Sequence, residues 1–122
     1  MTAMETIRAA IEKAEGFVTL GMGVEAWETL EDLPTEAKNH PRVLELRVES
    51  LICLREWEKA KILGDGIAAA LPDSVSLWLS LARARAGLGR REAAREAMTR
   101  VRLLDPSRRL EMLDDPLLRR VL

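Results

Sequence analysis

The sequence has few of the residues that build disulfides, metal sites and catalytic centres. One cysteine and one histidine occur among its 122 residues, so it offers no internal disulfide and too few ligands for a metal set. Cys53 has apolar neighbours on both sides, which indicates an unreactive thiol. His40 precedes Pro41 and is typical of a turn or helix N-cap rather than a general base. We therefore expect no enzyme activity, no cofactor and no bound metal.

Long apolar runs are also missing. No stretch reaches the ~18 apolar residues that a membrane span requires, and residues 1–5 lack the basic start and apolar run of a signal peptide. Apolar residues still make up 48% of the chain, while proline and glycine number five and seven. These values predict one folded domain, residues 1–122, in the cytoplasm, and the arginine-rich composition favours a bacterial source.

Lysine is absent from the second half of the chain. Residues 1–61 hold 8 Lys/Arg and 12 Asp/Glu, a net charge of −4, whereas residues 62–122 hold 11 Arg and 8 Asp/Glu, a net charge of +3. The asymmetry fits either two solvated helix faces with a bias toward arginine, or a dipolar module that binds a charged partner or its own copy head to tail. The overall pI of 5.9 argues against nucleic-acid binding.

A period of 34 residues organises the sequence. It is seen in three sets of identical residues, namely Ala26, Ala60 and Ala94, then Leu20, Leu54 and Leu88, and the prolines Pro72 and Pro106. A repeat of this length is typical of a helix–turn–helix unit. The period divides the chain into units 7–40, 41–74 and 75–108, followed by a C-terminal capping segment, 109–122.

The third unit shows the pattern most clearly. Trp78, Leu81, Ala82 and Arg85 follow the i, i+3, i+4, i+7 spacing of one helix face. Gly87 and Gly89 then end the first helix. A second helix is expected over residues 90–104, with Asp105-Pro106 as its end and three inward residues, Ala94, Met98 and Val101.

This combination resembles the tetratricopeptide repeat (TPR), with Arg85 standing where that family usually has tyrosine. The resemblance covers about 100 residues. It implies an all-α fold, an α-α superhelix forming a right-handed solenoid of about seven to eight helices.

Several residues depart from the repeat. Gly64 stands where a bulky residue is usual, which predicts either close packing by a large neighbour such as Trp78 or a kink. Pro34 arrives early, so the second helix should stop near Leu33 and residues 35–39 should form a connection, such as one helical turn. Arg47 and Arg85 occupy inward positions, and each should therefore have a carboxylate or backbone carbonyls as acceptors.

Helix ends and the C-terminal cap are also predicted. Thr2 with Glu5 resembles a capping box, and Pro41 suits the first position of a helix. Asp115-Pro116 resembles the start of a last short helix, and the last helix pair should be covered by Leu110, Leu113 and Leu117. Residues 117–122 are apolar for a free terminus, and either dock on the array or form an exposed patch used in association.

In proteins of this family, the first helix of each pair lines a concave groove that holds an extended peptide or a helix. By position, the resemblance implies a partner groove here that contains Arg8, Ile11, Glu12, Glu15, Arg42, Glu45, Glu49, Ile52, Leu79 and Arg83. The Lys/Asn clamp with which some members bind a C-terminal carboxylate is missing.

The four glutamates of this set favour a partner segment with Lys/Arg and apolar anchors. The alternative is that they are solvated or pair with Arg8, Arg42 and Arg83 across the groove.

We expect a non-catalytic interaction module or adaptor that binds another protein, with no nucleic acid and no membrane. The alternatives are a secretion-type chaperone for an aggregation-prone client, and a self-assembling repeat module that forms a weak homo-oligomer through the C-terminal segment.

Overall fold

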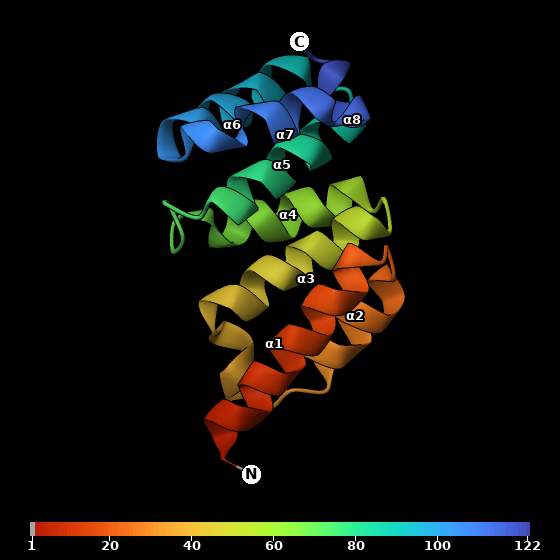
Figure 1. Ribbon diagram of the computed structural model, residues 1–122, viewed down its shortest axis with the longest axis vertical. Coiled ribbons are helices and arrows are strands. Elements are labelled where there is room, and N and C mark those ends of the chain that lie inside the picture. Colours follow the sequence, from red (N-terminus) through yellow and green to blue (C-terminus); the bar gives the residue numbers. More distant parts are fainter. Residues whose placement is uncertain (1) are drawn as a thin grey trace.

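Helices make up the structure, a computed structural model that describes residues 2–122 (Figure 1). These residues form eight α-helices and no β-strand, so the predicted all-α class and helix number are confirmed. The α-helices are α1 (Ala3–Thr19), α2 (Gly23–Glu31), α3 (Pro41–Cys53), α4 (Trp57–Ala68), α5 (Val75–Gly87), α6 (Arg91–Leu104), α7 (Arg109–Asp114) and α8 (Pro116–Arg119). Two 3₁₀ helices, η1 (Thr35–Asn39) and η2 (Pro106–Arg108), lie in the connections.

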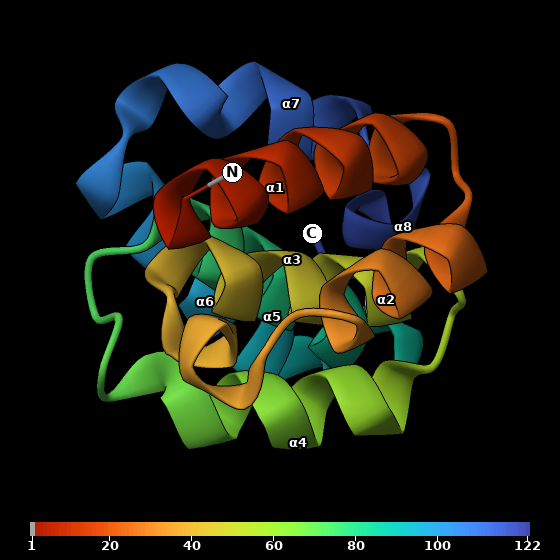
Figure 2. The same ribbon diagram turned by 90° about the horizontal axis from the view of Figure 1, so that it is seen from below.

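Each of the first five helices packs against the next one in the chain, and α3 also contacts both α1 and α5. The helix pairs therefore lie one above another along the long axis, with the N- and C-termini at opposite ends (Figure 1). Viewed along that axis, α1 and α7 lie on the same side of the molecule (Figure 2). The face that includes α1, α3 and α5 is thus flanked by the C-terminal segment.

Helix boundaries repeat with the period of the sequence. The helices α2, α4 and α6 begin 34 residues apart, at Gly23, Trp57 and Arg91. The helices α1, α3 and α5 end 34 residues apart, at Thr19, Cys53 and Gly87. The sequence period is therefore also a period of the backbone.

The turn between the two helices of a pair has the same backbone conformation in all three pairs. Its central residue has a positive φ, 73° at Gly21, 55° at Arg55 and 74° at Gly89. In the first turn the N–H of Gly21 donates to Val18 and that of Met22 donates to Phe17, which is the Schellman pattern that satisfies the last carbonyls of a helix. The equivalent bonds form around Arg55 and Gly89. Arg55 alone carries a Cβ in this left-handed conformation.

Small residues lie where the helices approach one another. Ala26, Ala60 and Ala94 are all 0% exposed, as are Ala14, Val48 and Ala82, the corresponding residues of the first helices. A side chain with few atoms lets two helix backbones come close, and the larger leucines around it fill the remaining space. The recurrent alanines are thus explained by packing.

Gly64 is a close-packing site, as expected, but the neighbour predicted from sequence was wrong. A Cβ on Gly64 would lie 2.7 Å from Cδ2 of Leu81, and the next nearest side chain is that of Leu77. Trp78 instead turns its indole N–H to the carbonyl of Pro72, at 2.8 Å. Leu81 is fully buried, so glycine at position 64 makes room for its isobutyl group.

The predicted helix ends agree with the structure. The Thr2 hydroxyl accepts from the N–H of Glu5, and Nδ1 of His40 accepts from the N–H of Arg42 with Pro41 as the first residue of α3. The connection after Pro34 is the single turn η1. The Asp115 side chain caps α8 by accepting from the N–H groups of Leu117 and Leu118.

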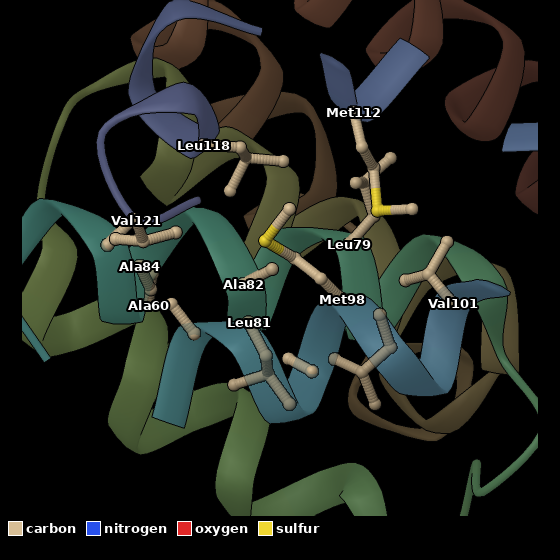
Figure 3. Close-up of a cluster of buried hydrophobic side chains, with 14 of the residues drawn as sticks. Ala60, Leu79, Leu81, Ala82, Ala84, Met98, Val101, Met112, Leu118 and Val121 are labelled. Carbon is tan, nitrogen blue, oxygen red and sulfur yellow. The ribbon is translucent and has the colours of Figure 1, made fainter. Parts of the chain in front are cut away.

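Of the three capping leucines expected, Leu117 is partly buried against the apolar cluster, whereas the prediction for the other two was wrong. Leu110 is 70% exposed and Leu113 37%, whereas Met112, Leu118 and Val121 are buried. Figure 3 shows these three side chains in one apolar cluster with residues of α5 and α6. The chain turns sharply at Asp115-Pro116, so α7 and α8 are separate helices whose inward residues do not follow one helical period. The C-terminal segment therefore docks on the array.

Both inward-facing arginines have acceptors, as predicted. The Arg47 guanidinium lies 3.1 Å from Glu31 and 4.9 Å from the centre of the Trp27 ring. Arg85 donates to the carbonyl of Ala93 at 3.0 Å and lies 3.5 Å from Asp65. Both charges thus have an acidic neighbour, although Nε of Arg47 is buried without a hydrogen-bond partner among the described residues.

Replacing Arg55 by glycine is expected to raise the free energy of unfolding by about 1 kcal/mol, because a left-handed conformation is costly only to residues with a Cβ. Chemical denaturation measures the change. The matched control is Gly89→Ala, which puts a Cβ at the same position of the next turn and should lower stability by a similar amount. Unchanged stability of Arg55→Gly would show that this turn is unstrained.

Two alanine substitutions in α4 test the close contact at Gly64. Gly66 is exposed, and a Cβ there would meet nothing within 4 Å, so Gly66→Ala should stabilise by about 0.5–1 kcal/mol through helix propensity. Gly64→Ala brings the same propensity but crowds Leu81, and overpacking costs ~1–3 kcal/mol. We expect a net loss of about 1 kcal/mol, measured by thermal and urea unfolding. Equal stabilisation by both variants would rule out the crowding.

Candidate functional site: a charged face on α1, α3, α5 and the C-terminal segment

Arg42 joins three carboxylates at the start of α3. Its guanidinium lies 3.0 Å from Glu15 of α1, 3.1 Å from Glu45 and 2.7 Å from Glu49. Glu45 and Glu49 follow Arg42 at i+3 and i+7, which places them above it on one face of the helix. Since Glu15 comes from the neighbouring helix, Arg42 ties α1 to α3.

Serine 74 extends this network to α5. Its hydroxyl donates to Glu45 at 2.5 Å, while the same oxygen accepts from the N–H of Leu77 and so caps α5. Glu45 therefore contacts residues from two helix pairs. The network bridges α1, α3 and the beginning of α5.

The three carboxylates share one guanidinium, and the pKa values of Glu49 and Arg42 are both raised. Burial raises the pKa of Glu49 above its ordinary value of 4.5, and the opposing attraction of Arg42 is the smaller influence. Burial by itself would lower the pKa of Arg42, but the charge of Glu49 and the hydrogen bonds to all three acids outweigh it and raise the pKa. The cation is fully compensated, whereas the partly buried Glu49 shares its cationic partner, Arg42, with two other acids.

A second network joins α5 to the C-terminal segment. Nε of Arg83 lies 2.7 Å from Asp115, and the guanidinium is 3.8 Å from Glu111. Glu111 also pairs with Arg108, at 2.5 Å. Asp115 uses one oxygen for Arg83 and the other to cap α8, so this carboxylate holds the C-terminal turn against α5.

The two networks form one surface, which we call the charged face. It consists of Glu15, Arg42, Glu45, Glu49, Arg83, Arg108, Glu111 and Asp115. The positive charge of Arg83 acts on Glu49, and the negative charge of Glu49 acts on Arg108. The surface thus continues from α1, across α3 and α5, to α7.

Cys53 lies beside this face at the end of α3. Burial and the charge of Glu49 raise the pKa of its thiol, although Arg83 opposes them. The thiol lies 3.7 Å from the carbonyl oxygen of Val18. A raised pKa keeps the thiol protonated and unreactive, which agrees with the character expected from its apolar neighbours.

The remaining groove candidates lie in different environments. Arg8 and Glu12 are exposed, and Ile11 and Ile52 are half-buried. Leu79 is only 3% exposed and belongs to the same apolar cluster as Met112 (Figure 3). Leu79 is therefore a core residue beneath the C-terminal segment, and a partner has no access to it there.

Sequence reasoning did not place Ser74, Arg108, Glu111 or Asp115 on this face. Their positions depend on how the chain returns after Pro106, and the 34-residue period gives no information beyond the third unit. Asp115 was recognised only as a helix cap, a role that it combines with its ion pair to Arg83. The Asp-Pro sequence was the available signal, since it fixes the turn between α7 and α8.

Within residues 2–122, no cluster of three or more His, Cys, Asp or Glu side chains has an arrangement that would hold a metal ion. None of the described helices combines the length and apolar character needed to cross a bilayer. Comparison of the chain with protein-family models, with curated proteins and with solved structures finds no match.

The raised pKa of Glu49 predicts how stability depends on pH. Because the native state holds this proton more tightly than the unfolded chain, rising pH lowers the free energy of unfolding from about 4.5 up to the native pKa. Glu49→Gln removes the titration. Wild-type stability relative to Glu49→Gln should therefore be greatest below this window and fall as pH rises through it.

Urea unfolding at a series of pH values measures this difference. Glu58→Gln, an exposed carboxyl on α4, controls for the change in net charge. A difference between wild type and Glu49→Gln that stays constant over the pH series would show that Glu49 titrates alike in both states.

Proposed function

We propose that the chain is a non-catalytic protein-binding module of the tetratricopeptide kind, acting in the cytoplasm of a bacterium. Its stacked helix pairs form a superhelix whose first helices, α1, α3 and α5, present the binding surface. The partner is a peptide or helix that carries Lys/Arg together with apolar side chains. The observation that carries this proposal is the excess of carboxylates around Arg42.

Charge supports a basic partner. The charged face has five carboxylates and three guanidinium groups, and Glu49 shares Arg42 with two other acids. A Lys or Arg of the partner would compensate this surplus without breaking the existing pairs. Electrostatic complementarity of this type speeds association and selects the partner more than it increases affinity.

Apolar surface on α1 and α3 supports a partner that also carries apolar side chains. Ile11 on α1 and Ile52 on α3 are both half-buried and pack against the core with only part of their side chains. The partly exposed isoleucines would contact the apolar residues of a bound segment. A partner with cations and apolar side chains on one face therefore fits these helices better than a purely ionic one.

The structure also decides which residue tests the proposal. Reversing Glu45 or Glu49 would remove ion pairs of Arg42 and disturb α1, α3 and α5 together. Glu12 lies one helical turn before Glu15 and is exposed, so its substitution leaves the network intact. Glu58→Lys on α4 makes the same charge change at another exposed position.

Binding of synthetic helical peptides that combine Lys/Arg with Leu is the test, with acidic and neutral peptides of the same apolar content for comparison. Fluorescence anisotropy should show binding of the basic peptide only, and amide NMR shifts should map to α1, α3 and α5. Glu12→Lys is expected to weaken binding about tenfold, whereas Glu58→Lys has no effect.

Shifts confined to other helices, or equal binding by Glu12→Lys and wild type, would overturn the proposed surface. Equal binding of the basic, acidic and neutral peptides would instead favour a chaperone that recognises apolar segments in general.

A further inference from the structure

A pocket lies between α6 and the C-terminal segment. Its volume is about 470 Å³, its interior includes Met98, Leu113 and Leu122, and Arg95, Arg102 and Arg109 also line it. Leu113 and Leu122 remain 37% and 52% exposed. The pocket thus combines an apolar interior with cations, and none of the residues of the charged face lines it.

The three arginines of this pocket lack carboxylate partners among the residues that the structure describes. Arg95 donates to the backbone carbonyl of Val121, and Arg102 donates to the hydroxyl of Thr99. Five other arginines of the same chain are paired with acids, namely Arg42, Arg47, Arg83, Arg85 and Arg108. Uncompensated charge around an apolar pocket fits an occupant that brings carboxylates.

The opposite end of the molecule carries those carboxylates. Glu25 and Glu28 of α2 and its C-cap residue Asp32 follow the i, i+3, i+7 spacing and are exposed. Glu36 of η1, which follows in the chain, is also exposed. In the described part of the molecule none of the four pairs with a cation. Exposed apolar surface accompanies them, since Val24 is 49% exposed.

These two surfaces lie toward opposite ends of the long axis. The first helix pair, with η1, occupies the N-terminal end, and α6 and α7 occupy the C-terminal end (Figure 1). The net charges of the two halves of the chain, −4 and +3, follow the same polarity. Each copy therefore has an acidic surface toward one end and a basic, apolar pocket toward the other. When two copies follow one another in the same orientation, the acidic end of one meets the basic end of the next.

We propose that the protein associates head to tail, with the arginine-lined pocket of one copy receiving the acidic α2–η1 surface of another. Such a contact joins two different surfaces, so it is a heterologous contact that can add further copies as concentration rises. Its charges are exposed, so salt weakens it. It leaves the charged face free and is independent of the proposed function.

Sedimentation velocity over a concentration series tests the association at low salt and at about 0.5 M salt, where screening is strong. The weight-average sedimentation coefficient of the wild type should rise with concentration at low salt and stay monomeric at high salt. The double variant Arg102→Glu/Arg109→Glu, and separately Glu28→Arg/Asp32→Arg, should each reduce the association constant about tenfold or more.

Complementation distinguishes this contact from general charge effects. An equimolar mixture of the two charge-reversed variants should associate again, because the native acidic surface of one meets the native pocket of the other and the two reversed surfaces are also complementary in charge. Lys59→Glu/Arg90→Glu reverses two exposed cations outside the pocket and should associate like the wild type. Failure of the mixture to associate, or loss of association in this control, would overturn the assignment.

A monomeric wild type at every concentration would also overturn it. A synthetic peptide of residues 23–37 then serves as a probe of the pocket. Its binding to wild type but not to Arg102→Glu/Arg109→Glu would assign the pocket to a different acidic protein, and the absence of binding would remove it as a docking site.

Discussion

Close contact between helix backbones at small residues is the constraint on which the rest of the structure depends. Ala26, Ala60 and Ala94 are completely buried at equivalent positions of three successive pairs. A helix pair of this kind buries only one face by itself, so it gains most of its stability from the pairs stacked on it. The C-terminal segment follows from the same need, because it covers the last face with Met112, Leu118 and Val121.

Features that depend on local sequence were predictable. Capping by Thr2, His40 and Asp115 requires only a short side chain or ring acceptor beside a helix start. Pro34 similarly ended α2 and produced a separate turn, since proline disfavours helix at the preceding residue. The period then extended these local signals over three units, so the order of α1 to α6 could be predicted from spacing, whereas α7 and α8 lie beyond the last unit.

Features that depend on contacts between units were not predictable. Trp57 and Gly87 form one compensating pair, since a Cβ at position 87 would lie 2.5 Å from the Trp57 ring. The preceding unit makes the same contact with glycine on the other side, where Gly23 lies against Cys53 and the carbonyl of Ser50. Each contact thus contains a glycine, which lies at the end of the first helix in one case and at the start of the second helix in the other. A single sequence shows that a residue is unusually small or large for its position in the repeat, but it does not show which residue packs against it.

For the candidate site, the sequence predicted several of the residues that belong to it, but it did not predict which of them form ion pairs with one another. Helical periodicity placed Arg42, Glu45 and Glu49 on one face, but the link to Glu15 depends on how closely α1 packs on α3. That link changes what the acids can do. Glutamates already bound to Arg42 act first to hold two helices together, and only their surplus charge is left for a partner. In the binding that we propose, recognition would therefore depend on exposed groups such as Glu12 and on the uncompensated ends of the array, while the paired residues supply the surface that orients them.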